Sequence, residues 1–246
     1  MDERDTAEPG GSERTRNAAA GTSSLSPTNE HPRDWRPGPL YAPIRALCVL
    51  IKSGLTRASV SGLEHLPRSG GVLLVSNHLS LADPVVLMAI SPRPLMFMAK
   101  EELYRPALAR LILHLWGGSF PVRRGATDIR AVREAFALLD AGAALVLFPE
   151  GTRRTAGLGE AHRGVGYLAA RAGKPVIPVG IVGTEAINGL WDLRRLPRFE
   201  VRFGEPFTVA AHDGEDPTDA IMRRIAALLP PERRGAYADS ELARAF

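Results

Sequence analysis

The stretch Gly71-Val-Leu-Leu-Val-Ser76 decides how this chain is expected to fold, because it is a short run of apolar residues with no charged residue inside it. Such a run is typical of a strand that is buried on both faces of a parallel sheet. Pro84 follows where a first helical residue belongs, and residues 85–90 continue as a helix. A buried strand that leads into a helix indicates an α/β fold.

The same alternation of strands and helices continues along most of the chain. Apolar runs predict further strands at residues 95–99, 120–122, 144–148 and 176–182, with a half-exposed edge strand at 198–203. Helical spacing predicts helices at residues 108–116, 128–140 and 165–172, and a last helix capped by Thr218 or Asp219. This order predicts a central, mostly parallel sheet with helices on both faces.

The first 38 residues differ from the rest, since they are rich in Gly, Ser, Thr, Pro and charged residues. We expect a disordered tail there, followed by a single domain over residues 39–246. The net charge is +4, and a basic surface suits anionic lipids, phosphorylated substrates or nucleic acid. Because aromatic residues make up only 6% of the chain, we expect no nucleic-acid partner.

Residues 39–58 form an apolar segment that charged residues, a proline and a glycine interrupt. It falls short of the ~20 apolar residues that a spanning helix needs, and no signal peptide is visible before it. It fits either an amphipathic helix that contacts a membrane surface or an ordinary helix that covers the core. Cys48 is the single cysteine, which excludes an intrachain disulfide and makes a cysteine-based metal site implausible.

His78 and Asp83 lie in the loop that follows the first buried strand. An imidazole there could take a proton from an alcohol near neutral pH, and a carboxylate bonded to its other nitrogen would fix the tautomer. The two side chains can meet only if the chain turns between them, since five residues along a helix would separate their faces. The alternative is structural, with Asp83 as a helix N-cap and His78 as a polar turn residue.

Two further loops carry anion-binding residues directly after predicted strands. Arg123 follows the strand at 120–122, and Glu150, Gly151, Thr152 and Arg153 follow the strand at 144–148. Arginine binds phosphate oxygens through its planar fork, glycine permits close backbone approach, and threonine offers a hydroxyl. Carboxyl ends of parallel strands meet at one edge of a sheet, which is where ligands bind.

These loops together resemble the glycerolphosphate and lysophosphatidic acid acyltransferase family. His78 and Asp83 match H-x-x-x-x-D, and residues 148–153 match F-P-E-G-T-R. The segments Phe120-Pro-Val-Arg123 and Val176-Ile-Pro-Val179 complete four blocks in the family's order. The resemblance covers about residues 60–210, and the ordered set is far more specific than H-x-x-x-x-D alone.

The resemblance implies an acyltransferase that moves a fatty acyl chain from acyl-CoA or acyl-carrier protein to the hydroxyl of a lysophosphatidic acid-type acceptor. It implies that His78 is the general base and that Asp83 orients it. Arg123 and residues 150–153 would hold the acceptor phosphate. No metal and no bound cofactor are implied, and the segment at 39–58 would contact the membrane surface. We therefore expect a membrane-associated protein of phospholipid biosynthesis, on the cytoplasmic face.

Three alternatives remain open at this point. The acceptor could be another lysophospholipid or a glycolipid. Residues 164–169 match the G-x-G-x-x-A fingerprint of an NAD(P)-dependent oxidoreductase, although a polar stretch stands where that fingerprint requires a strand. A non-catalytic lipid-binding protein of the same fold is the third, and the intact pair of His78 and Asp83 gives it no support.

Overall fold

Seven strands form a single sheet in the computed structural model, which describes residues 35–123, 128–209 and 216–238. They are β1 (Arg57–Ser61), β2 (Val72–Ser76), β3 (Leu95–Lys100), β4 (Ser119–Val122), β5 (Ala144–Leu147), β6 (Val176–Val182) and β7 (Arg198–Phe203). Their order is β1-β7-β6-β2-β5-β3-β4, and all neighbours run parallel except β6 and β7. The expected mostly parallel sheet is confirmed for the described residues.

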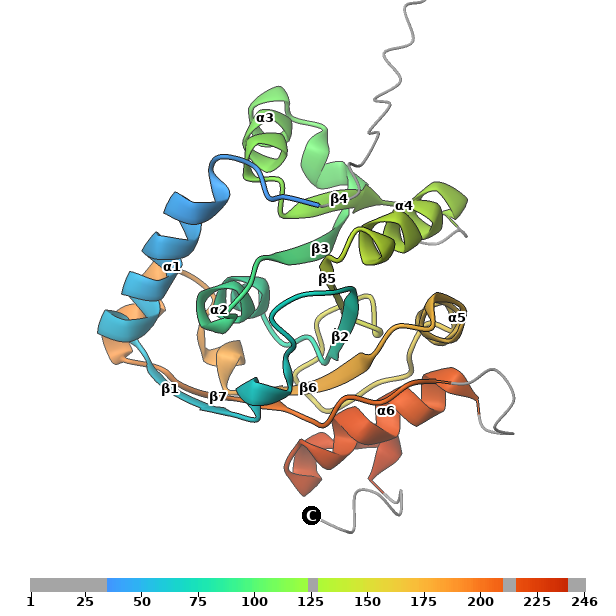
Figure 1. Cartoon of the computed structure of the whole chain (residues 1–246). Helices are drawn as coiled ribbons and strands as arrows, with labels where there is room; N and C mark the ends of the chain where they lie inside the picture. Colours follow the sequence, from blue (N-terminus) through green and yellow to red (C-terminus); the bar gives the residue numbers. More distant parts are fainter. Residues whose placement is uncertain (1–34, 124–127, 210–215, 239–246) are drawn as a thin grey trace, which may run out of the picture. The chain divides into compact units, whose positions relative to one another are not determined.

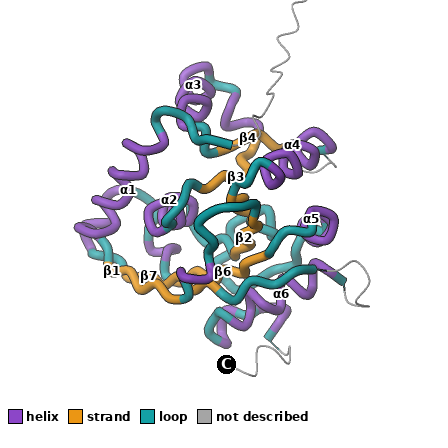
Figure 2. Tube along the Cα trace, in the orientation of Figure 1, coloured by secondary structure: helices purple, strands orange, loops and turns teal. Residues whose placement is uncertain are grey.

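Helices cover both faces of this sheet (Figure 1). They are α1 (Tyr41–Leu55), α2 (Ala82–Ile90), α3 (Ala107–Trp116), α4 (Ile129–Asp140), α5 (Gly164–Ala172) and α6 (Pro217–Ala227). Short 3-10 turns lie between and after these elements: η1 (Leu63–His65), η2 (Glu101–Tyr104), η3 (Thr184–Ala186), η4 (Leu190–Arg195), η5 (Pro231–Arg233) and η6 (Gly235–Tyr237). Helices α4, α5 and α6 pack on one face, and α2 packs on the other with α1 outside it. Figure 2 shows the same layers with the strands between the two groups of helices.

The central strand β2 shows why its sequence reads as a continuous apolar run. Leu73 and Val75 point into the core beneath α4, α5 and α6, whereas Val72 and Leu74 point into the core beneath α2. All four are fully buried, because successive side chains of a strand alternate between faces and both faces are covered. This arrangement places the end of β2, and the loop after it, in the middle of the sheet.

The edge of the sheet differs from the prediction. β1 was not predicted, because four of its five residues are exposed and only Val60 gives it an apolar side chain of any size. It pairs in parallel with β7 over residues 57–61, so β7 is an inner strand and its prediction as an edge strand is wrong. Its alternating pattern reflects burial of Phe199, Val201 and Phe203 on one side only.

Helix boundaries differ from the prediction where capping decides them. Helix α2 begins at Ala82, so Pro84 is its third residue and not its first. Helix α6 begins after Asp216, whose carboxylate accepts from the backbone N–H of Thr218, so neither predicted cap residue is the cap. Pro at the first position of α6 suits an N-terminus, where the missing N–H needs no partner.

Helix α1 is docked on the domain by one face only. Its Tyr41 is buried, accepts a hydrogen bond of 2.7 Å from the backbone N–H of Leu95, and stacks on Trp116. Upstream, the N–H of Trp35 donates to the carbonyl of Ala141, so contacts of the domain reach into the end of the segment expected as a tail. The rest of that segment lies outside the described residues. No helix among the described residues is long and apolar enough to cross a bilayer.

Candidate active site

The loops that follow β2, β5 and β6 meet at one edge of the sheet. β2 lies between β5 and β6 and runs parallel to both, so their carboxyl ends share an edge. The three loops carry His78 and Asp83, Glu150 and its neighbours, and Thr184, respectively. Their backbone contacts fix the edge: the N–H of Arg154 donates to the carbonyl of His78 at 2.8 Å.

His78 and Asp83 are in direct contact, with 2.7 Å between His78 Nδ1 and Asp83 Oδ2. The chain turns at Ser80, whose carbonyl accepts from the N–H of Asp83, before α2 begins. His78 therefore lies ahead of the helix while Asp83 lies in its first turn and points back. The turn that the contact requires is present, and Asp83 is not an N-cap of α2.

Asp83 is surrounded by hydrogen-bond donors, although its side chain is fully buried. Oδ2 also accepts from the backbone N–H of Leu79 and Ser80, at 2.7 and 2.9 Å. Oδ1 accepts from the hydroxyl of Thr184 at 2.5 Å. The two backbone N–H groups and the Thr184 hydroxyl suit an ionised carboxylate, which accepts only. Against such a carboxylate His78 Nδ1 is the donor, and in a neutral imidazole Nε2 is then the nitrogen that can accept a proton.

The ring of His78 is held in place from its side as well. Phe148 stacks on it with 4.1 Å between ring centroids, and only about a tenth of the His78 side chain is exposed. Next to it, the Asn77 side chain both donates to the carbonyl and accepts from the N–H of Ile181, at 2.8 Å each. This amide clamps the end of β2 to β6, so the loop that carries His78 starts from a fixed point.

Glu150 holds two loops together through backbone groups. Its carboxylate accepts from the N–H of His78 at 3.2 Å and from the N–H of Gly159 at 2.8 Å. Burial raises the pKa of Glu150 above its ordinary value of 4.5, against the hydrogen bonds from Gly159 and His78, which lower it. A buried carboxylate with both oxygens engaged is suited to positioning the loop, and an anionic group would also repel a phosphate.

The remaining residues of this loop face outward. Thr152 and Arg153 are exposed, and Gly151 adopts a left-handed conformation with φ of 62°. A Cβ at Gly151 would lie 2.6 Å from Nε2 of His162, so the imidazole lies directly against this glycine. His162 was given no role from the sequence, because nothing in its spacing connects it to residues 148–153.

Arg123 stands apart from the other predicted site residues. It follows β4, the outermost strand at the far side of the sheet, and pairs with Glu101 at 3.4 Å in an exposed contact. Within the described part of the chain, no hydrogen bond or ion pair joins it to His78 or Glu150. Among those residues, no group of three or more His, Cys, Asp and Glu has the arrangement of a metal site.

A family model described as acyltransferase matches residues 57–182, which is just over half of the chain. The chain belongs to the acyltransferase family. The matched region contains β2, β5 and β6, which lead into the site loops, the pair of His78 and Asp83, and the loop of Glu150. The family resemblance inferred from the motifs is thus confirmed.

Curated relatives of this acyltransferase carry names of one activity. It is 28% identical over 127 residues to a 1-acyl-sn-glycerol-3-phosphate acyltransferase of Borreliella burgdorferi, covering 51% of each chain. It is 34% identical over 126 residues to the human 1-acyl-sn-glycerol-3-phosphate acyltransferase alpha, covering 50% of this chain and 44% of the human one. The match spans about half the length of these relatives, or less.

The fold of this acyltransferase is also that of a solved structure. The 1-acyl-sn-glycerophosphate (LPA) acyltransferase PlsC of Thermotoga maritima superposes with a TM-score of 0.60 at 24% identity, covering 74% of this chain and 75% of that one.

The dinucleotide fingerprint lacks its context, since a loop and not a strand precedes α5. Gly166 is needed there for packing, because a Cβ would lie 2.4 Å from Thr218 Oγ1.

Proposed function

We propose that this acyltransferase moves a fatty acyl chain from acyl-CoA or acyl-carrier protein to the free hydroxyl of a lysophosphatidic acid-type acceptor. The observation that carries the proposal is the buried contact between His78 and Asp83 at the edge of the sheet. The names of the relatives support the acceptor class. Another lysophospholipid or a glycolipid acceptor would suit the same base, so the acceptor is the first thing to test.

The chemistry would run without an acyl-enzyme. Nε2 of His78 takes the proton of the acceptor hydroxyl as its oxygen bonds to the thioester carbon. When the C–S bond breaks, the thiolate leaves and receives that proton from the imidazolium, so the ester and a free thiol are the products. Asp83 stabilises the imidazolium while it exists, and Thr184 keeps Asp83 in position.

The acceptor phosphate would be met by exposed groups around the site. Thr152 and Arg153 offer a hydroxyl and a guanidinium, and the bend at Gly151 lets a ligand approach the backbone. Arg123 would join them only by exchanging Glu101 for the phosphate, which an exposed ion pair permits at little cost. Glu150 would act indirectly, by accepting a hydrogen bond from the backbone N–H of His78.

The lipid acceptor also asks for contact with a membrane, and we propose that α1 supplies part of it. Its outward positions carry no charged residue, and Leu47 and Leu50 are 56% and 70% exposed there. The opposite face is docked on α2 through Tyr41 and Cys48. A helix whose apolar face points away from its own domain fits the interface plane of a bilayer. We further propose that the membrane-associated protein works at the cytoplasmic face.

The test is release of free thiol from an acyl-CoA in detergent, with and without each acceptor, led by lysophosphatidic acid. His78→Ala is expected to lower turnover about a hundredfold or more, as loss of a general base does. His114→Ala on the exposed side of α3 serves as the matched histidine control and should keep full turnover.

Release that depends on both an acceptor and His78 is the expected result. Release that needs no acceptor would indicate a thioesterase and overturn the proposal. Full turnover of the His78→Ala protein would remove the general base from the mechanism.

A further inference from the structure

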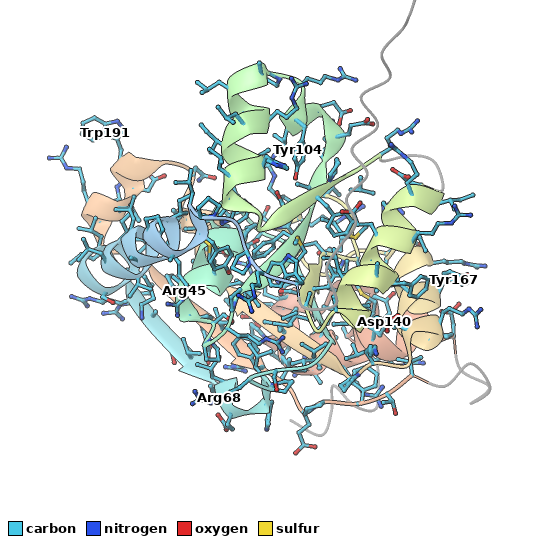
Figure 3. The ribbon with its side chains drawn as sticks, turned by 45° about the horizontal axis from the view of Figure 1, so that its top comes forward. Arg45, Arg68, Tyr104, Asp140, Tyr167 and Trp191 are labelled. Carbon is cyan, nitrogen blue, oxygen red and sulfur yellow. The ribbon has the colours of Figure 1, made fainter. Side chains whose placement is uncertain are left out.

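The turn η4 exposes an aromatic side chain to an unusual degree. Trp191 is 77% exposed, more than any other large apolar side chain of the described residues. In Figure 3 it stands at the margin of the molecule and points away from the sheet. Arg194 lies over its ring, with 5.2 Å from the guanidinium carbon to the ring centroid. The segment is outside the region that the family model matches.

This segment presents Trp191 from an ordered turn. The carboxylate of Asp192 accepts from the backbone N–H groups of Asn188 and Gly189, and Leu193 anchors the turn in the protein. Leu196 has a left-handed backbone, with φ of 48°, and its side chain is 41% exposed. Trp191 and Leu196 are thus both exposed on an ordered turn, so no entropy would be lost in ordering this turn when a partner binds.

The turn lies next to the end of α1. The N–H of Arg57 donates to the carbonyl of Pro197 at 3.0 Å, and Arg57 is the Cα partner of Arg198 across β1 and β7. Leu55, at the end of α1, is 42% exposed beside this junction. In Figure 1 the orange turn η4 lies near the C-terminal end of α1. The exposed apolar side chains of η4 and of the end of α1 therefore lie on neighbouring segments of the structure.

Basic side chains lie on the same segments as the apolar ones. Arg57, Arg194, Arg195 and Arg198 are all exposed, and Asp192 is occupied with backbone groups. Tryptophan favours the boundary between headgroups and acyl chains, and arginine extends from apolar surface to anionic headgroups. A surface with an aromatic centre and a cationic rim is complementary to an anionic bilayer.

The same segment is tied to the catalytic loop. The hydroxyl of Ser80 donates to the carbonyl of Ile187 at 2.6 Å, and Asn188 begins the turn directly after it. Leu81, in the catalytic loop, is 71% exposed. A bilayer bound at η4 would therefore meet the loop that carries His78 without any rearrangement.

We infer that Trp191, Leu196, Arg194 and Arg195 form a docking surface for anionic phospholipid bilayers, beside the outward face of α1. The inference rests on the proposed function in that the acceptor is taken to be a lipid held in a membrane. It adds a second contact point far from α1 in sequence, so the two elements together would fix the orientation of the active site over the bilayer.

The test is partition of the full chain between buffer and vesicles of phosphatidylcholine alone or mixed with phosphatidylglycerol. Trp191→Ala should lower the partition constant on anionic vesicles about tenfold, from loss of aromatic burial. The double variant Arg194→Gln/Arg195→Gln should lower it about thirtyfold at low salt. Tyr167→Ala and Arg171→Gln on α5 are the matched controls, because both residues are exposed, and Tyr167 stands at the opposite margin of Figure 3.

Brominated lipids supply a second measurement. They should quench tryptophan fluorescence of the wild-type protein and not of Trp191→Phe, since Trp35 and Trp116 pack against the core. Unchanged partition of the variants, or quenching that survives Trp191→Phe, would overturn the inference. A self-associating wild type that becomes monomeric on substitution, without vesicle binding, would assign the surface to a second copy and overturn it too.

Turnover in detergent separates this inference from the proposed function. If the variants lose vesicle binding and keep detergent turnover, both stand. If the wild-type protein binds vesicles through Trp191 and transfers no acyl group to any acceptor, the proposed function fails and the docking surface stands.

Discussion

Removing the hydroxyl of Thr184, and with it the hydrogen bond to Asp83, tests the site most directly. It donates to Oδ1 of Asp83 at 2.5 Å, both side chains are fully buried, and Thr184→Val keeps the shape while it deletes the donor. A hydrogen bond to a charged group contributes about 1.5–3 kcal/mol. We expect the free energy of unfolding to fall by about that amount, because Asp83 keeps three donors on Oδ2 and loses its donor on Oδ1.

The same substitution should lower kcat about tenfold, with KM for both substrates nearly unchanged. A carboxylate held less firmly orients His78 less well, and about 1.4 kcal/mol in the transition state is a factor of ten. Thr184 touches neither substrate in the proposed mechanism, so it is a positioning residue. Thr184→Ser, which restores the hydroxyl, should recover most of the turnover.

The assay is steady-state thiol release in detergent, paired with urea denaturation of each variant. Thr56→Val is the matched control, because its hydroxyl donates to the carbonyl of Lys52 at the end of α1, away from the site. Wild-type kcat in Thr184→Val, with Thr184→Ser no better than Val, would refute the reasoning that this hydrogen bond orients the catalytic pair.

Two further predictions concern stability. Burial raises the pKa of Glu150, so this carboxyl keeps its proton to a higher pH in the folded protein than in the unfolded protein. The free energy of unfolding of the wild-type protein should therefore fall, relative to that of Glu150→Gln, as the pH rises above about 4.5. Denaturation across a pH series measures this difference, and a difference independent of pH would contradict it. Gly166→Ala should cost about 1–3 kcal/mol by forcing α5 from Thr218, whereas Gly164→Ala, with open space around it, should cost nothing. Equal denaturation midpoints for these two variants would show that α5 and α6 do not pack as described.

Helix faces show where sequence patterns lose their information. The helical spacing of α4 puts Ile129, Val132, Phe136 and Leu139 on one side, yet of these only Leu139 is fully buried and Ile129 is 59% exposed. The helix also buries Ala131, Ala135 and Leu138, and its small alanine side chains let it lie close to the sheet. The apolar spacing of α3 also predicted a helix, yet none of the residues of α3 is buried. Periodicity shows that a face is apolar and does not show what covers it.

The candidate site also has one part that the sequence predicts and one part that it does not. His78 and Asp83 could be paired from the sequence because only five residues and one turn separate them. Thr184 could not be found, since it lies 101 residues from Asp83 and follows an ordinary buried strand. Glu150 was expected beside the phosphate, and its contacts with backbone groups appear only once the loops after β2 and β5 are side by side.

The sequence by itself determined the alternation of strands and helices, the loops that carry His78, Asp83 and Glu150, and the family. These follow from interactions between residues close in the chain, where spacing and residue type decide the outcome. The tertiary structure alone decided the strand order that brings β5 and β6 against β2, and with it the donor from Thr184. It also decided which apolar faces stay exposed, on α1 and at Trp191. Such contacts depend on the packing of distant segments, which local spacing does not encode.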